Sequence, residues 1–179
     1  IYTFFHTFYC MQPALTVVIP TYKEATTILN TISKLCEIAK IYKLPMEILV
    51  VDDNSPDGTA KLASGFVPST ELATVRVIVR TKDKGLSQAV IAGFDAAAAD
   101  IILVTDADGS HPFGTIPELY TLIKNGEADV AVGSRYMEGG AIEDWPVQRR
   151  VISIGATLLA RVIFPSVTDP VSGFFAVRK

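Results

Sequence analysis

Two aspartates stand two positions apart, directly after a run of apolar residues. Asp106 and Asp108 follow the apolar segment 101–105, and Ser110 and His111 come next. Carboxylates at this spacing can both turn toward one hard cation, Mg²⁺ or Mn²⁺, which also accepts oxygen from a substrate phosphate. The alternative is an Asp-Gly turn in which an aspartate caps a helix and His111 makes one loop hydrogen bond. Taken alone, the pair favours the turn.

A second acidic cluster, Asp52 and Asp53, follows the apolar segment 48–51. A carboxylate here can accept hydrogen bonds from a ribose or a base. The alternative is a loop of Asx turns that caps a helix near Thr59. The first apolar segment, 15–19, leads into Pro-Thr-Tyr-Lys-Glu, so the glycine fingerprint of dinucleotide-binding proteins is missing, and so is a Walker loop. This argues against an NAD-dependent oxidoreductase, and a bound diphosphate would need a metal ion or arginines.

Arginines are available beyond these clusters. Arg135 lies in Gly-Ser-Arg-Tyr just after the apolar segment 130–132, and Arg149 and Arg150 follow Trp145. The guanidinium fork matches phosphate oxygens. The alternative is that these arginines form surface ion pairs, which contribute little to stability.

The elements that must position these residues alternate regularly. Short apolar runs rich in Val and Ile, bounded by polar or turn residues, are typical of buried parallel strands and occur at 15–19, 48–51, 75–79, 101–105 and 130–132. Apolar residues spaced by three and four predict helices over 28–38, 89–96 and 116–123. The alternation predicts a doubly wound α/β fold. Ligands bind outside the carboxyl ends of such strands, so the five polar loops there predict one site.

Composition excludes several classes of protein. The chain has 179 residues, 49% hydrophobic and 20% charged, which suits one globular domain. Sixteen Lys and Arg against nineteen Asp and Glu give a net charge of −3, which argues against nucleic-acid binding. Cys10 and Cys36 form no C-x-x-C, so a disulfide scaffold and a cysteine zinc site are not expected, and buried thiols in a reducing compartment are.

No apolar run reaches the roughly 20 residues of a membrane span. We interpret the mostly apolar segment 151–164 as a core-facing amphipathic helix rather than a helix that lies on a membrane surface or lines a lipid-tail groove. Residues 1–14 are expected to be an N-terminal extension without the features of a signal peptide, and residues 15–179 one domain. The natural protein is expected to continue beyond Lys179.

Together the motifs resemble the family-2 inverting glycosyltransferases with the GT-A fold, and within that family the dolichyl-phosphate and other polyprenyl-phosphate mannosyltransferases. Each motif is weak alone, but their order and spacing are specific from about Leu15 to the end of the chain. The matching stretches are V-I-P-T-Y-K-E at 18–24, V-D-D-N-S-P-D-G-T at 51–59, K-G-L at 84–86, D-A-D-G-S-H-P at 106–112, G-S-R-Y at 133–136, G-G at 139–140, Trp145, Arg149 and D-P-V-S-G-F at 169–174. The resemblance implies a Rossmann-like three-layer α/β/α domain with a mostly parallel sheet.

The resemblance also implies roles for single residues. The positions that match the nucleoside-binding residues are Pro20, Tyr22, Glu24 and Asp53, and further substrate-binding positions are Val51, Lys84 and Ala107. Asp106 and Asp108 match the metal-binding carboxylates that also meet the donor, and Ser110 stands at the third ligand position. Arg135 and Arg149 match arginines near the donor diphosphate and the acceptor phosphate, and with Asp108 they form the expected catalytic set. Some relatives have Gln in place of Ser110, which leaves the choice between Mg²⁺ and Mn²⁺ open.

The implied reaction moves mannose from GDP-mannose to dolichyl or another polyprenyl phosphate, with inversion to a β-linked product. A phosphomonoester has a second pKa of about 6, so the acceptor is largely dianionic and needs no strong general base. The alternatives are a UDP-glucose-dependent polyprenyl-phosphate glucosyltransferase, transfer to a polysaccharide, and a non-catalytic nucleotide-sugar-binding fragment. The lipid acceptor implies a membrane surface, reached through an anchoring subunit, a C-terminal anchor or peripheral contact. The expected location is the cytosolic face of the endoplasmic reticulum in a eukaryote or of the plasma membrane in a prokaryote.

Overall fold

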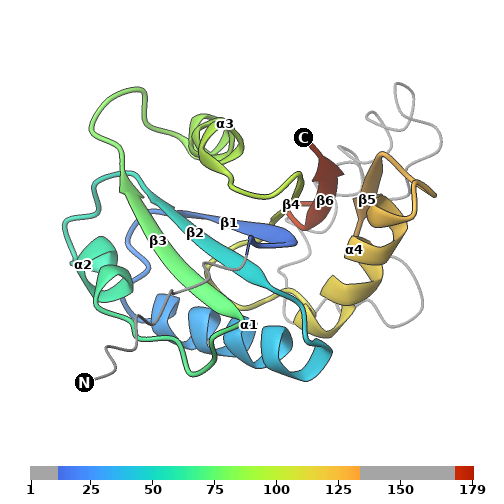
Figure 1. Ribbon diagram of the computed structural model, residues 1–179. Helices are drawn as coiled ribbons and strands as arrows, with labels where there is room; N and C mark the ends of the chain where they lie inside the picture. The colour runs from blue at the N-terminus through green and yellow to red at the C-terminus, as the bar shows by residue number, and fades with distance from the viewer. Residues whose placement is uncertain (1–11, 134–171) are drawn as a thin grey trace, which may run out of the picture.

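The computed structural model describes residues 12–133 and 172–179, which form one six-stranded sheet with helices on both faces (Figure 1). The strands are β1 (Leu15–Thr21), β2 (Met46–Asp52), β3 (Ala73–Val79), β4 (Ile101–Val104), β5 (Val130–Val132) and β6 (Phe175–Arg178). The helices are α1 (Ile28–Tyr42), α2 (Thr59–Ser64), α3 (Leu86–Ala96) and α4 (Ile116–Lys124), and a 3-10 turn, η1 (Phe113–Thr115), precedes α4.

The strand order is β3-β2-β1-β4-β6-β5. Strands β1 to β4 pair in parallel, whereas β6 runs antiparallel to both of its neighbours, β4 and β5. The predicted α/β class with a mostly parallel sheet is therefore confirmed. The alternation of apolar runs misses β6, which inserts between β4 and β5. Four residues following a glycine-containing motif carry too little pattern to be read as a strand.

The sheet is buried on both faces, which explains the continuous apolar runs. Leu15, Val17 and Ile19 of β1 belong to the core shared with α1 and α4, and Val18 belongs to the core under α3. Figure 1 shows α1 and α2 on one side of the sheet and α3 on the other. Helix α3 lies very close to β1, because a Cβ at Gly93 would be 2.4 Å from Cγ1 of Val18.

Cys36, a residue of α1, is buried in the core between α1 and the sheet, as predicted for a buried thiol. Burial raises the pKa of Cys36, so the thiol stays protonated at neutral pH. Cys10, most of the predicted N-terminal extension and the apolar segment 151–164 lie outside the described residues. No helix in the described ranges is both long and apolar enough to cross a membrane.

The order of the strands places a switch point between β1 and β4. The chain leaves β1 through α1 to β2 on one side, and β4 lies on the other side after a crossover through α3 on the opposite face. At such a point the loops that follow the two strands diverge and leave a crevice at the carboxyl edge. The predicted site residues after β1, β2 and β4 all belong to this edge.

Candidate active site

A cavity of about 430 Å³ opens at the carboxyl edge of β1 and β2. It is lined by the loops after these strands and by the start of α3, through Pro20, Thr21, Tyr22, Asp53, Lys84, Gly85, Leu86 and Ala89. Its size is that of a small-molecule site, and most of its wall is apolar. Four of the residues predicted to bind the donor therefore surround one cavity: Pro20, Tyr22, Asp53 and Lys84.

Glu24 is not among the residues that line this cavity. Its carboxylate accepts the Thr27 hydroxyl at 2.7 Å, and its carbonyl oxygen accepts the backbone N–H groups of Thr27 and Ile28. In the structure Glu24 thus organises the turn into α1.

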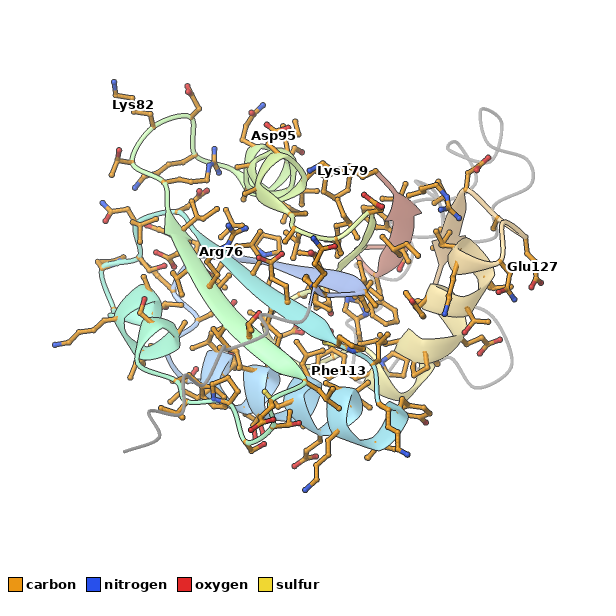
Figure 2. All side chains as sticks on the ribbon, in the orientation of Figure 1. Arg76, Lys82, Asp95, Phe113, Glu127 and Lys179 are labelled. Carbon is orange, nitrogen blue, oxygen red and sulfur yellow. The ribbon has the colours of Figure 1, made fainter. Side chains whose placement is uncertain are left out.

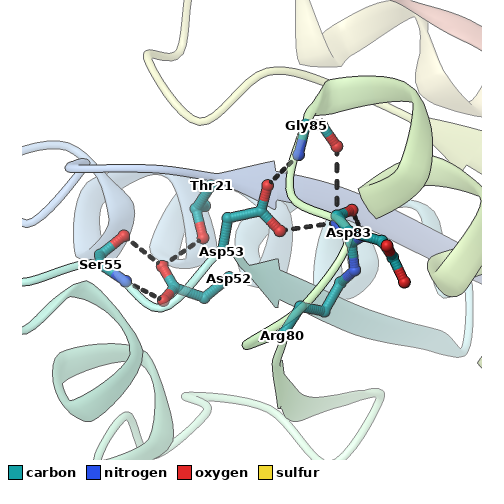
Figure 3. Close-up of polar contacts among 7 residues, drawn as sticks. All are labelled: Thr21, Asp52, Asp53, Ser55, Arg80, Asp83 and Gly85. Carbon is teal, nitrogen blue, oxygen red and sulfur yellow. Dashed lines mark hydrogen bonds and ion pairs between the residues drawn. The ribbon is translucent and has the colours of Figure 1, made fainter.

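Asp53 is tied to the loop between β3 and α3 (Figure 3). Its Oδ1 lies 2.6 Å from Nη1 of Arg80, and its Oδ2 accepts the backbone N–H of Gly85 at 2.6 Å. Arg80 also donates to the carbonyl oxygens of Asp83 and Gly85. The side chains of Arg80 and Asp53 are only 11% and 9% exposed. This nearly buried ion pair attaches the loop between β3 and α3 to the end of β2. Lys84 lies on that loop.

Arg80 was not among the residues predicted for the site. The register of the sheet indicates Arg80 as a partner of Asp53. Asp52 pairs with Val79, so the residues that follow them, Asp53 and Arg80, are neighbours. That signal needs the knowledge that β2 and β3 are adjacent.

Asp52 holds its own loop and does not line the cavity. It is fully buried, its Oδ2 accepts the hydroxyls of Thr21 at 2.9 Å and Ser55 at 2.6 Å, and its Oδ1 accepts the backbone N–H of Ser55 at 2.7 Å (Figure 3). Asp57 accepts the hydroxyl and the N–H of Thr59, the first residue of α2, and the hydroxyl bond is the main reason why the pKa of Asp57 is lowered. The Asx-turn alternative therefore describes Asp52 and Asp57.

The loop after β4 is anchored through the residue between the two candidate metal ligands. Ala107 is buried in the core, and its carbonyl oxygen accepts the Thr31 hydroxyl of α1 at 2.7 Å. Val51 is also fully buried, in the core under α3. Both residues were predicted to bind substrate, and their side chains face the two cores, so only their backbone atoms are available to a ligand.

Among residues 12–133 and 172–179, Asp106 and Asp108 each leave one carboxylate oxygen without a protein hydrogen bond. The Asp106 side chain is 47% exposed, and its Oδ2 lies 3.1 Å from Nε2 of His111. Asp108 is exposed, with its Oδ1 accepting the backbone N–H of Ser110 at 2.9 Å. Ser110 is exposed beside it. His111 makes the single loop hydrogen bond predicted for it, and that bond is to Asp106.

This pair fits a divalent cation that is shared with a substrate. The described part of the chain holds no group of three or more His, Cys, Asp or Glu side chains arranged for a metal ion. Mg²⁺, however, keeps several waters and is usually bound through one or two carboxylates plus substrate phosphates. Two open carboxylates on an anchored loop provide the oxygen ligands that such a cation prefers.

The residues just before β6 lie next to the loop that carries the two aspartates. Gly173 lies beside Asp106, where a Cβ would be 3.4 Å from both carboxylate oxygens. The Ser172 hydroxyl donates to the carbonyl oxygen of Gly133 at 2.9 Å and accepts the N–H of Phe174 at 3.2 Å. The S-G-F stretch thus packs against the first of the two aspartates.

Comparison with known proteins now places the chain. Residues 16–179 match the model of glycosyl transferase family 2. The chain belongs to this family. Among curated proteins it is 46% identical over 168 residues to the dolichol-phosphate mannosyltransferase of Pyrococcus furiosus, a match that covers 92% of this chain and 46% of the relative. It is 36% identical over 175 residues to the enzyme of the same name from Saccharomyces cerevisiae, covering 94% of this chain and 62% of the relative. This family-2 chain therefore spans about half the length of the curated relatives it matches.

Solved structures share the fold. A glucosyl-3-phosphoglycerate synthase of Mycobacterium tuberculosis has a TM-score of 0.64 and 25% identity, over 93% of this chain and 58% of the other. The mannosyltransferase PcManGT of Pyrobaculum calidifontis, solved with GDP-Man and Mn²⁺, has a TM-score of 0.55 and 23% identity, over 69% of this chain and 36% of the other. The predicted GT-A fold is confirmed.

Apart from Glu24 in the turn into α1 and Val51 in the core, the predicted site residues of this family-2 chain fall into three groups. One group surrounds the cavity, and a second lies on the loop after β4 with Asp106, Asp108 and Ser110. Arg135 and Arg149 form the third group and lie outside the described residues, as does Trp145.

Proposed function

We propose that this chain is the transferase part of an enzyme that moves mannose from GDP-mannose to the phosphate of dolichol or another polyprenol. The observation that carries the proposal is the pair of open carboxylates, Asp106 and Asp108, at the same sheet edge as a nucleoside-sized cavity. The choice of mannose and a lipid phosphate is supported by relatives that are 35–46% identical and are named for transfer of mannose to dolichol or undecaprenyl phosphate.

The cavity suits the nucleoside of the donor. Tyr22 and Leu86 are large, exposed apolar side chains at its wall, and they can pack against the faces of a base. Lys84, on the loop fastened by Arg80, adds a positive charge for the phosphates. The diphosphate then extends toward the loop after β4, which neighbours β1 at the switch point.

Asp106 and Asp108 are the residues that would hold Mg²⁺ or Mn²⁺. A cation bound there would neutralise charge on the departing nucleoside diphosphate. The Thr31 hydroxyl fixes the carbonyl of Ala107 and so sets the backbone from which both carboxylates project. Ser110, at the third ligand position, would add a hydroxyl oxygen to these carboxylates, and the proposal covers both cations.

The acceptor phosphate needs orientation more than activation. As a dianion it attacks the anomeric carbon of mannose directly, opposite the leaving diphosphate, so an α-linked donor gives a β-linked product. The ring nitrogen Nε2 of His111 is engaged with Asp106, in keeping with a reaction that uses no strong histidine base. We assign the orientation of the phosphates to Arg135 and Arg149, because the motifs that contain these arginines resemble those of the family.

The lipid acceptor requires contact with a membrane. The proposal therefore includes a membrane surface as partner, at the cytosolic face where GDP-mannose is available, with attachment through an anchoring subunit or a further segment of the protein. Nucleic acid is not a partner in this proposal, because the chain is weakly acidic with a net charge of −3.

The decisive experiment measures donor binding and then transfer. Calorimetric titrations with GDP-mannose and with UDP-glucose, each with Mn²⁺ and with EDTA, are followed by an assay of labelled mannose transfer to dolichyl phosphate. Metal-dependent binding of GDP-mannose with transfer supports the proposal. A preference for UDP-glucose would assign the chain to glucosyl transfer, and binding of neither donor by the folded chain would identify a non-catalytic fragment.

A matched pair of variants ties the result to the site. Asp108→Asn removes one open carboxylate, and Asp95→Asn removes the same charge from the exposed outer side of α3 (Figure 2). The proposal expects metal-dependent donor binding to fall only in Asp108→Asn.

A further inference from the structure

The Asp106 carboxylate lies next to residues from two distant parts of the chain. Its Oδ2 lies 3.1 Å from Nε2 of His111, five residues further along the same loop. Gly173, just before β6, lies beside it, because a Cβ at this position would be 3.4 Å from both carboxylate oxygens. Asp108, in contrast, contacts the backbone of its own loop through Ser110.

His111 is itself held in a fixed plane. Its ring stacks on Phe174, with 4.9 Å between the ring centroids and 10° between the planes, and its side chain is 10% exposed. Phe174 is fully buried. A Cβ at Gly133 would lie 2.2 Å from Cδ1 of Phe174, so the glycine allows the ring to sit directly on β5's end. Ser172 adds the hydrogen bonds that join the Phe174 N–H to the Gly133 carbonyl.

The hydrogen-bond chemistry of this contact has one consistent direction. An ionised carboxylate only accepts hydrogen bonds, so His111 donates from Nε2–H to Oδ2. The bond uses one acceptor position of Oδ2 and leaves Oδ1 for a cation. A carboxylate that is nearly half exposed would otherwise rotate freely, and holding it in one orientation favours metal binding. Hydrogen-bond partners of metal ligands typically change metal affinity by about 10–100-fold.

We propose that His111, stacked on Phe174, is a positioning residue that presents the Asp106 carboxylate to the divalent cation. The inference rests on the proposed function, because it needs Asp106 to be a metal ligand. It gives the S-G-F stretch at 172–174 a defined task, which is to build the platform for His111. His111 acts through Asp106 and is not itself a ligand of the cation.

Two variants separate the hydrogen bond from the stacking. His111→Phe keeps an aromatic ring on Phe174 and removes the donor, whereas His111→Gln removes the ring and keeps an N–H group in the place of Nε2. Mn²⁺ binding is measured from the electron paramagnetic resonance signal of free Mn²⁺, with the chain alone and with GDP. Wild type, Asp106→Ala and Asp95→Asn are measured in parallel, and circular dichroism confirms folding.

The expected result is a loss of Mn²⁺ affinity of about 10–100-fold in His111→Phe, with His111→Gln within about threefold of wild type. Binding of GDP in EDTA is expected to stay unchanged in both variants, since it does not involve the cation. If His111→Phe is not folded, His111→Leu, which also lacks a donor, takes its place.

Three outcomes would overturn the inference, and they differ in whether the proposed function is refuted as well. Wild-type Mn²⁺ affinity in His111→Phe together with a loss in Asp106→Ala would refute the role of His111 and leave the proposed function standing. Equal losses in the Phe and Gln variants would show that the hydrogen bond is not the cause. Wild-type affinity in Asp106→Ala would refute both the inference and the metal assignment of the proposed function.

Discussion

Two pairs of aspartates lie at the same edge of the sheet, one after β2 and one after β4, and they differ in burial and in hydrogen bonding. Asp52 and Asp53, after β2, are 0% and 6% exposed, and each of their four carboxylate oxygens has a protein partner. Asp106 and Asp108, after β4, are half-buried and exposed, and each carboxylate has a single protein hydrogen bond among the described residues. We call them the closed pair and the open pair. A carboxylate whose oxygens are satisfied stabilises the fold, whereas an open one is available to a ligand.

The difference arises from which strands lie next to each pair. Strand β2 is flanked by β1 and β3, so Thr21 from one side and Arg80 from the other reach Asp52 and Asp53. Strand β4 is flanked by β1 and the short β6, and Val104 pairs with Phe175 at the beginning of β6. Just before β6, Gly173 lies beside Asp106 and Phe174 stacks on His111, and neither residue has a side-chain hydrogen-bond donor.

Removing an open carboxylate should produce the largest change in activity. We expect Asp108→Asn to lower mannosyl transfer by about 100–1,000-fold, the range for losing one electrostatic stabiliser of a transition state. The temperature of unfolding should stay near that of wild type, because the Asp108 side chain is exposed. The assay is transfer from GDP-mannose to dolichyl phosphate with saturating Mn²⁺. Full transfer by this variant would refute the metal assignment.

Removing a partner of the closed pair should lower stability. Arg80→Met leaves the nearly buried Asp53 carboxylate without the guanidinium that pairs with it. We expect a loss of about 3 kcal/mol in the free energy of unfolding, the lower end of the range for a broken buried ion pair. GDP binding should also weaken, because the loop that carries Lys84 and Gly85 loses its attachment. Urea unfolding and calorimetry measure the two effects.

The double variant Asp53→Asn/Arg80→Met is the control for this experiment. It removes both charges, so part of the stability should return. An unchanged urea midpoint in Arg80→Met would show that the Asp53–Arg80 ion pair does not stabilise the loop between β3 and α3.

Asp52→Asn tests the same comparison with a smaller change. The asparagine keeps one acceptor oxygen but loses the charge that receives three hydrogen bonds, and we expect a loss of about 2 kcal/mol in unfolding free energy. Mn²⁺ affinity should remain that of wild type, in contrast to variants of the open pair. Reduced Mn²⁺ affinity without reduced stability would contradict the division into closed and open pairs.

The smallest expected effect concerns Asp57, which is fully exposed. Hydrogen bonds, mainly from the Thr59 hydroxyl, lower its pKa in the folded state. The unfolded value is about 3.9, so the contribution to stability is present above about pH 4 and is lost as the pH falls through the folded pKa. The melting temperature of Asp57→Asn should therefore lie slightly below that of wild type at pH 7 and converge with it once the pH falls below the folded pKa.

Asp95→Asn is the control for the pH experiment, because Asp95 is also exposed. A difference between wild type and Asp57→Asn that grows on acidification would contradict the assignment.

Much of the fold could be predicted because its signals are local. The strands β1 to β5 are short apolar runs, and α1, α3 and α4 repeat apolar residues at three and four positions, so each pattern is complete within its own segment. The Asp106 and Asp108 pair was recognisable for the same reason, since it directly follows such a run. Arg80, β6 and the stacking of His111 on Phe174 were not predictable, because each depends on segments that are distant in the chain.

The sequence by itself therefore determined which residues reach the carboxyl edge of the sheet. The end of an apolar run marks that edge, and the polar residues after it must lie there. The tertiary structure alone decided which of them are closed and which are open. Placing β3 beside β2 brings Arg80 to Asp53, and placing β6 beside β4 brings Phe174 under His111. Both contacts follow from the order of strands, which no local pattern contains.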